Sequence, residues 1–471
     1  MRTVIVLLCL LALSGCVARK AAIPPQAAVN APAGWRGGVR SPGEVDPDWW
    51  QSFGDPVLTN VVKTALENND DISVAASRVS EARALFHLAR AQALPNVNGV
   101  AEGSRDRDVN PGFGVPESQT SGAGEVEVSY DLDLFGRLSS ETGAARATLL
   151  SSEAARDNVR LAVAASAAGG YITLRALDER VAVLRDTLAE RGAELTIARR
   201  RAGAGYSSQL DLTQAEAEYR ATEQLIPATE LAITRQENGL SLLLGDNPSA
   251  IRRGISLAAL ANPAVPVLMP SALLRRRPDI VAAEEALAAA DHKLDSARAA
   301  FMPDVRLAAS GGLVGSTIVT GSPITVFSLG GSVLAPLFDS GRLAAQRDAA
   351  TARRDQAAYT YRKAVLAAFR EVEDELAAVQ RDNEQQQTLA AERDVLTRSL
   401  SLATHRFRAG YSPYLDQLDA QRNLLATQLA LVQVRSDLLG AVVLLYQALG
   451  GGWAMDSLND DQMANVQLSQ K

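Results

Sequence analysis

The residues whose type and spacing suggest chemistry are aspartates near one another on a helix. Asp416 and Asp419 lie three residues apart, so a helix would place both carboxylates on one face. Carboxylates held close together attract cations. Asp211 and Asp416 are the last residues of two similar segments of the sequence, 201–211 and 406–416. As an alternative, the three aspartates would only complement the positive ends of helices.

Nothing else in the chain favours catalysis. The three histidines, His87, His292 and His405, are scattered and have no metal-ligand spacing around them. The sequence contains no P-loop, no G-x-S-x-G and no Gly-rich dinucleotide motif. A net charge of −7 argues against a nucleic-acid footprint. We therefore expect a protein that is not an enzyme, holds no cofactor or metal and binds no nucleic acid.

Cys16 closes an N-terminal segment typical of exported lipoproteins. The apolar run 4–13 is too short to span a membrane, and we interpret residues 1–15 as a signal peptide. The sequence L-S-G-C resembles the bacterial lipobox, which implies cleavage before Cys16 and acylation of its thiol. A signal peptide with a chance cysteine is the alternative. Val17 follows, where an aspartate would favour inner-membrane retention, so we expect a lipid anchor in the outer membrane.

The segments that carry the aspartates occur twice. Residues 201–211 read R-A-G-A-G-Y-S-S-Q-L-D and residues 406–416 read R-F-R-A-G-Y-S-P-Y-L-D, an offset of 205. The same or a similar offset relates Gly136 to Gly341, Gly245 to Gly450 and Pro95 to Pro303, the last pair being 208 apart. This period is far longer than the roughly 20 to 50 residues of solenoid repeats. Most of the chain is therefore one unit duplicated.

The duplication predicts the order of segments. We expect a signal peptide at 1–15, a lipidated extended tether at 16–48, a first repeat at 49–262, a second at 263–450 and a tail at 451–471. Each repeat would contain a helix, a β-hairpin (96–135 or 304–340), a long helix and a return helix. A long helix of about 65 residues would span roughly 100 Å. Pro227 in the first return helix has Val432 as its counterpart, so we expect a kink in the first copy alone.

The strands decide the fold class. In E-V-E-V-S-Y-D-L-D-L, residues 125–134, acidic or polar residues alternate with apolar ones, which is the period of a strand with one apolar face. The length suits a tilted membrane strand, and an ordinary soluble sheet is the alternative. Four strands cannot close a barrel, and open edges are excluded in lipid. The chain must oligomerise: dimers would give eight strands and trimers twelve.

Five stretches together give the chain a close resemblance to a known family. They are W-W-Q-S-F-G-D-P-V-L (49–58), Y-D-L-D-L-F-G-R (130–137), L-L-R-R-R-P-D-I-V-A-A-E (273–284), P-L-F-D-S-G-R (336–342) and L-D-Q-L-D-A-Q-R (415–422). Nearly all of the mature chain resembles the outer membrane factors, the TolC-like efflux proteins, in the lipoprotein branch that serves resistance-nodulation-division (RND) pumps.

The resemblance implies a fold and a function. The chain would be mainly α with a four-stranded β contribution, and three copies would form a twelve-stranded outer-membrane barrel continuous with a periplasmic α-helical barrel. The homotrimer would be the exit duct of a tripartite efflux pump for small molecules, docking a periplasmic adaptor protein and an inner-membrane RND transporter. A type I protein secretion outlet and a structural coiled-coil lipoprotein without a pore are the alternatives.

The resemblance also assigns roles near the hairpin turns. Asp416 and Asp419 match family positions that form an acidic ring at the closed periplasmic entrance. Asp211, Arg408 and Arg422 match or neighbour positions where relatives tie that entrance closed. The turns themselves, which would form the tip and dock the adaptor, are Gly205, Tyr206, Gly410 and Tyr411. Phe407 and Ser412 depart from relatives that have a tyrosine and an arginine, so the form of the latch stays open.

Overall fold

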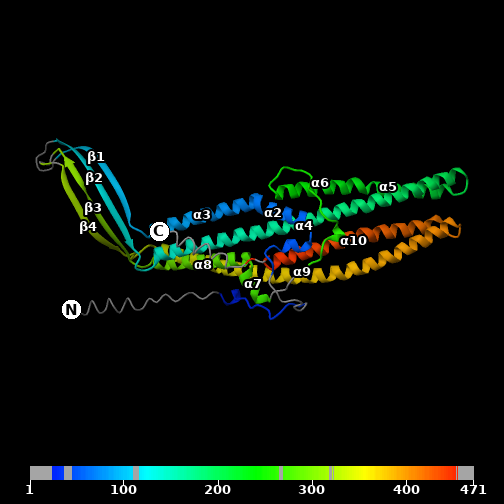
Figure 1. Cartoon of the computed structure of the whole chain (residues 1–471). Helices are drawn as coiled ribbons and strands as arrows, with labels where there is room; N and C mark the ends of the chain where they lie inside the picture. The colour runs from blue at the N-terminus through cyan, green and yellow to red at the C-terminus, as the bar shows by residue number, and fades with distance from the viewer. Residues whose placement is uncertain are drawn as a thin grey trace.

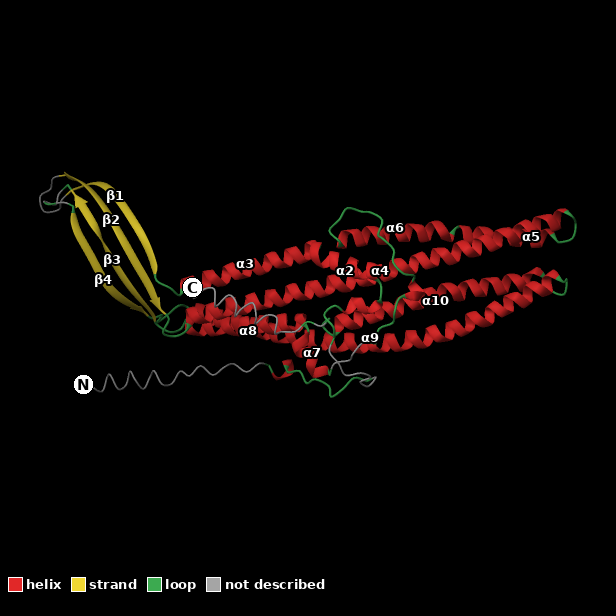
Figure 2. Cartoon of the chain, in the orientation of Figure 1, coloured by secondary structure: helices red, strands yellow, loops and turns green. Residues whose placement is uncertain are grey.

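The molecule is elongated, with a four-stranded sheet at one end and helices over the rest of its length (Figure 2). The computed structural model describes residues 24–36, 45–109, 116–264, 269–317, 321, 323–451 and 453. Cys16 and nearly all of the predicted tail at 451–471 lie outside these residues.

Both halves of the chain share one order of elements: two short helices, two strands, a long helix and a return helix (Figure 1). A short helix, η1 (Pro25–Ala27), precedes them. The first half contains η2 (Trp49–Phe53), α2 (Pro56–Asn68), α3 (Asp70–Gln92), β1 (Asn96–Val109), β2 (Pro116–Leu132), α4 (Arg137–Gly203), α5 (Gln209–Glu223), α6 (Leu225–Leu243) and η3 (Leu257–Ala259). The second contains α7 (Pro270–Arg276), α8 (Pro278–Ala299), β3 (Asp304–Ser316), β4 (Ile324–Leu334), α9 (Arg342–Arg408) and α10 (Tyr414–Ala448).

The long helices α4 and α9 set the length of the molecule. Each has 67 residues, which corresponds to about 100 Å. Both begin after a glycine in the left-handed conformation, Gly136 with φ 77° and Gly341 with φ 86°. An aspartate satisfies the first N–H groups in each case: Asp133 accepts from Leu138 N at 3.0 Å, and Asp339 accepts from the equivalent nitrogen at 2.8 Å.

The two return helices differ as the position of Pro227 predicts. In the first half, the return helix breaks at Gln224 into α5 and α6, whereas α10 is continuous through Val432. Pro227 has no N–H to donate to the carbonyl four residues earlier, so the helix loses a hydrogen bond at this point. The break confirms the predicted kink in the first copy alone.

The hydrophobic core lies midway along the molecule, where the short helices surround the long ones. Trp49 is fully buried and stacks on Tyr446, with ring centroids 5.0 Å apart and planes at 14°. Part of the expected tether at 16–48 reaches this core: Trp35 is buried and contacts Phe369 edge-on, at 6.2 Å between ring centroids. The region holds the two helical hairpins at a fixed spacing.

The four strands form one antiparallel sheet in the order β1-β2-β3-β4. Val97 lies opposite Val128 in the first hairpin, and Val305 lies opposite Val333 in the second. β2 and β3 join the two hairpins, with Val128 opposite Ala309. β1 and β4 are the edges, each paired on one side within the part of the chain that the structure describes.

One described helix, α10, is long and apolar enough to cross a membrane on length and composition. It packs along α9 and α4 within the helical part of the molecule, and 44% of its most apolar window is buried there. This burial makes it a core helix of the bundle.

Candidate functional site

The two helical hairpins end in turns of the same geometry. Gly205 and Gly410 have φ values of 75° and 78°, which glycine adopts at no steric cost. The N–H groups of Tyr206 and Tyr411 each donate to the carbonyl five residues earlier at 2.8 Å, which closes the helix end as a Schellman motif. Both tyrosine side chains are exposed, at 86% and 80%. The turns therefore present an aromatic ring at each tip.

Asp211 and Asp416 occupy equivalent positions but have different partners. Ser208 caps α5, and it exchanges two hydrogen bonds with Asp211: Asp211 N donates to Ser208 Oγ at 3.1 Å, and Ser208 N donates to the carboxylate at 3.2 Å. Pro413 caps α10 and has no N–H, so the same bond to the Asp416 carboxylate cannot form. The alternative role as a helix-capping group thus fits Asp211. The Asp416 carboxylate lacks the local N–H donor that Asp211 has.

Asp416 and Asp419 are both exposed on α10 in the single chain. Asp419 lies 3.7 Å from Arg422 Nη1, one turn further along the helix. Asp416 and Asp419 share one side of the helix, as their spacing predicts. Two carboxylates per chain are therefore available to face a common axis.

A small apolar cluster joins the two hairpins behind their turns. Its buried members are Leu195, Ala215, Tyr414 and Leu418, contributed by α4, α5 and α10. Phe407 of α9 packs against it, with its ring centroid 5.3 Å from that of Tyr414. Phe407 thus contributes packing between the hairpins. A cavity of about 80 Å³ lies beside this cluster, lined among others by Asp211 and Arg408.

An ion network, in which Arg191 and Glu218 are buried and Arg422 is half exposed, connects the same three helices. Arg191 of α4 is 5% exposed; its Nη1 lies 3.0 Å from Glu218 Oε2 and donates to Thr222 Oγ1 at 2.6 Å. Arg422 of α10 donates from Nε to the other oxygen of Glu218 at 2.8 Å. The Glu218 carboxylate therefore holds one arginine from each hairpin, and the loss of one partner would leave a charge without compensation.

A second link runs between the hairpins one turn nearer the tip. Glu194 of α4 accepts from Gln417 Nε2 and from Gln421 Nε2 of α10, both at 2.6 Å. The two glutamines are four residues apart, so they lie on one face of the helix. Each oxygen of the carboxylate thus accepts from α10, which fixes the hairpins relative to each other.

The Tyr414 hydroxyl lies in this acidic surrounding. Burial raises the pKa of Tyr414 to about 12, and the negative charges of Glu194 and Glu218 add to the shift. Tyr414 is therefore neutral at physiological pH and functions as an apolar wedge between the hairpins.

The five charged residues predicted at the tip do not form one common network in the structure. Arg422 joins Glu218, Asp211 caps α5, and Arg408 lines the cavity beside Asp211. The interhairpin links were not predicted from the sequence; their members are Arg191, Glu194, Glu218, Gln417 and Gln421. Gln417 and Gln421 have the i, i+4 spacing of one helix face, but this spacing does not identify their partner on α4.

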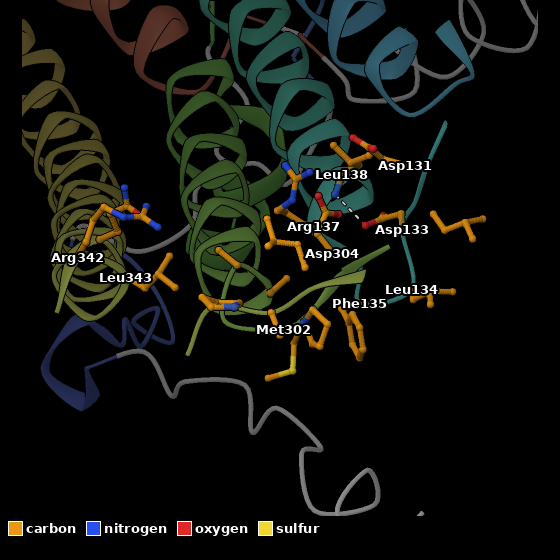
Figure 3. Close-up of a pocket in the computed structure, with 18 residues that line it drawn as sticks. Asp131, Asp133, Leu134, Phe135, Arg137, Leu138, Met302, Asp304, Arg342 and Leu343 are labelled. Atoms are coloured by element: carbon orange, nitrogen blue, oxygen red, sulfur yellow. Dashed lines mark hydrogen bonds between the residues drawn. The ribbon is translucent and has the colours of Figure 1, made fainter. Parts of the chain in front are cut away.

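The strands meet the helices at a second hollow, of about 390 Å³ (Figure 3). Asp133 lies here. Burial alone would raise the pKa of Asp133, but hydrogen bonds from the N–H groups of Ser139 and Leu138 outweigh it and hold the pKa below its usual value. Leu134 and Phe135 follow in the connection to α4 and are exposed. The junction thus presents apolar side chains beside a charged capping group.

The sheet has one apolar face and one mostly polar or small-residue face. Residues directly opposite in an antiparallel register point to the same side. One face carries large exposed apolar side chains, namely Val97, Val126, Leu307, Leu313, Phe327, Leu329 and Val333. The other carries Asn98, Glu102, Glu125, Glu127, Asp131, Arg306, Ser310 and Ser332. No described element covers the apolar face, which argues against an ordinary soluble sheet.

The chain is similar to proteins of known class over nearly its whole length. A family model described as "Outer membrane efflux protein" matches residues 61–246 and 269–451, which lie in the two repeats. The pyoverdine export outer membrane protein OpmQ of Pseudomonas putida is 34% identical over 96% of this chain and 98% of its own length. The toluene efflux pump outer membrane protein TtgC of Pseudomonas putida is 35% identical over 89% of this chain and 88% of its own.

Solved structures agree with these relatives. A membrane protein from Pseudomonas aeruginosa superposes with a TM-score of 0.84 and 31% identity, over 92% of this chain and 99% of that one. The open state of the Neisseria gonorrhoeae MtrE outer membrane channel gives a TM-score of 0.80 and 27% identity, over 92% and 98%. With both repeats, the sheet and the hairpins all matched, the chain belongs to the outer membrane efflux protein family.

Proposed function

We propose that three copies of this chain form the outer-membrane exit duct of a tripartite efflux pump. The observation that carries this function is the sheet, which has an uncovered apolar face, an opposite face rich in polar side chains, and two open edges. Such a sheet is stable in a bilayer only when its edges are closed, with the apolar side toward lipid and the polar side toward water. Three copies give twelve strands, an even number within the range of bacterial barrels.

The helices continue the duct away from the membrane. The hairpins α4–α5 and α9–α10 run away from the strands, and their turns lie at the opposite end of the molecule (Figure 1). Three chains would bring six tips around one axis, with Asp416 and Asp419 of each chain facing it as an acidic constriction. Behind that constriction, Arg422 would hold the hairpins in the closed arrangement through Glu218, while Asp211 caps α5 and Arg408 lines the adjoining cavity.

The partners follow from the position of the tips. A periplasmic adaptor protein would dock on the exposed turns at Gly205, Tyr206, Gly410 and Tyr411, and an RND transporter of the inner membrane would deliver the cargo. Acylation of Cys16 would add a lipid anchor in the outer membrane. The cargo would be small molecules, because the relatives named above export pyoverdine or toluene.

Channel formation is tested with the full chain expressed in an outer membrane. We expect a trimer that resists SDS until heated, and discrete conductance steps in planar bilayers. Replacement of Val126, Val128 and Tyr130 by polar residues would place polar groups against lipid and abolish both. A non-pore spacer would tolerate these substitutions and would show no conductance steps, and either result contradicts the proposal.

Cargo and partners need a cellular test. Deletion of the gene should increase the sensitivity of the cell to small toxic compounds, and complementation should restore resistance. A protein-secretion outlet would instead lose a secreted polypeptide without a change in compound sensitivity. Cys16→Ser should leave export intact if the strands alone hold the duct in the membrane, and it should abolish incorporation of labelled fatty acid.

A further inference from the structure

Along strand β1, the side chains on the apolar face of the sheet change from apolar and small to basic. From the helical end outward, this face presents Val97, Gly99, Ala101 and Gly103, and then Arg105 and Arg107. Arg105 lies opposite Thr120, and Arg107 opposite Ser118. Thr120 N also donates to Thr317 Oγ1 at 3.0 Å, which brings a further hydroxyl beside the pair. Two cations and three hydroxyl side chains thus gather on one face of the sheet.

Strand geometry gives the position of the two arginines across the membrane. They lie eight and ten residues beyond Val97, the first residue of β1 on the apolar face. At about 3.3 Å per residue and a tilt of roughly 35–45°, they stand about 20 and 25 Å further across the membrane. The apolar band of an outer-membrane barrel is about 25 Å tall. Given the proposed function, on which this step rests, both guanidinium groups lie at the external border of that band.

No described side chain neutralises these cations. Both side chains are exposed, and neither forms an ion pair with any side chain in the described part of the chain. The carboxylate between them in sequence, Asp106, points to the opposite face and accepts from Ser104 Oγ at 2.8 Å. A charge on the lipid-facing side of a barrel is costly near the midplane and is tolerated at the interface, where it meets headgroups. The expected counter-ion is therefore outside the protein.

We propose that Arg105 and Arg107, with the hydroxyls of Ser118, Thr120 and Thr317, bind phosphate groups of the phosphorylated glycolipid in the outer leaflet. Guanidinium groups bind phosphate oxygens in bidentate geometry, and hydroxyls donate further hydrogen bonds. Phospholipids occupy the inner leaflet, about 25 Å away across the apolar band, so the position of the arginines selects the glycolipid. The trimer would carry three such sites around its external rim.

The proposal is tested by titrating the purified full-length trimer in neutral detergent with lipid A, the phosphorylated glycolipid moiety, and counting bound molecules by native mass spectrometry. We expect up to three lipid A molecules per trimer and an about tenfold weaker Kd in R105Q/R107Q. Dephosphorylated lipid A has no phosphate for the arginines, and phosphatidylglycerol has one phosphodiester where lipid A has two phosphate groups, so both should bind the wild type at least tenfold more weakly than lipid A. R105K/R107K keeps both charges but loses the bidentate geometry, so its Kd should lie between those of the wild type and R105Q/R107Q.

A matched control and a second readout separate this inference from the channel itself. R393Q/R398Q removes two exposed arginines from α9, far from the strands, and should leave the Kd for lipid A unchanged. All variants are also examined for trimer formation and conductance. A wild type that forms no conducting trimer contradicts the proposed function. A conducting R105Q/R107Q trimer with the wild-type Kd, or equal binding of phosphatidylglycerol by the wild type, overturns the glycolipid site alone.

Discussion

At the scale of the residue, the equivalent aspartates of the two repeats differ because the residues that cap their helices differ. Asp211 is held by Ser208, whereas Pro413 offers no N–H to Asp416. We predict that D416N/D419N lowers the cation selectivity of the channel, because six carboxylates would leave the constriction of the trimer. Ion selectivity and single-channel conductance in planar bilayers measure this. D211N is the matched control and should keep the selectivity; an unchanged double variant would contradict the acidic ring.

Tyr414 gives a pH dependence with a defined sign. Its pKa is raised from 10.0 to about 12 by burial and by the neighbouring Glu194 and Glu218. A group whose folded-state pKa is raised contributes its full stabilisation below pH 10 and loses it as the pH rises through about 12. We predict that ionisation of the Tyr414 hydroxyl has its midpoint near pH 12. It is measured as the difference between the absorbance-monitored pH titrations of the wild type and of Y414F. A midpoint near 10 would show that the hydroxyl is not enclosed between the hairpins.

At the scale of the element, strand pairing depends on one glycine. A Cβ at Gly312 would collide with the carbonyl oxygen of Gly124 and lie 2.7 Å from the Cα of Glu125, so β3 approaches β2 closely at this point. We predict that Gly312→Ala reduces the yield of heat-modifiable trimer at least tenfold. Gly330→Ala in β4 meets no atom within 4 Å and should assemble normally. Equal yields from the two variants on unheated SDS gels would refute the pairing argument.

The hairpins are linked through Glu218, which holds Arg191 and Arg422. Removal of one charge from a buried ion network typically costs about 3–5 kcal/mol. We therefore predict that Glu218→Gln loosens the tip and raises the mean conductance of the closed channel in planar bilayers. Glu223→Gln, on the exposed side of α5, is the control and should conduct like the wild type. A closed-state conductance equal to the wild type in E218Q would show that the network does not hold the tip.

What the sequence predicts at this scale depends on whether the signal is local. The turns at Gly205 and Gly410, the starts of the long helices and the break near Pro227 are each determined by a few neighbouring residues, so their positions follow from the sequence. The contacts of Glu194 and Glu218 with α10 join residues more than 200 positions apart. These contacts depend on how the two hairpins pack. The presence of a charged residue in a helix does not indicate which distant residue it will contact.

At the scale of the whole molecule, the duplication constrains how neighbouring chains pair. The hairpins superpose in register: Val97 and Val305 are 208 apart, and their partners Val128 and Val333 are 205 apart. β2 pairs with β3 inside the chain, with Glu127 opposite Ser310. If β4 pairs with β1 of the next copy in the same way, Ser332 takes the place of Glu127, which is 205 residues earlier. Glu102 takes the place of Ser310, which is 208 residues later. Ser332 of one copy should then lie opposite Glu102 of the next.

The register predicts a specific cross-link. Ser332 and Glu102 lie on the face assigned to the lumen, and within one chain they are on opposite edges of the sheet. We predict that S332C/E102C forms disulfides between chains upon mild oxidation and yields a covalent trimer on non-reducing gels, because paired positions bring Cα atoms within about 4.4–6.8 Å. S332C/N98C, displaced by four residues on the same face, should remain uncross-linked. A cross-link in the displaced pair alone would show that the seam between chains departs from the internal symmetry.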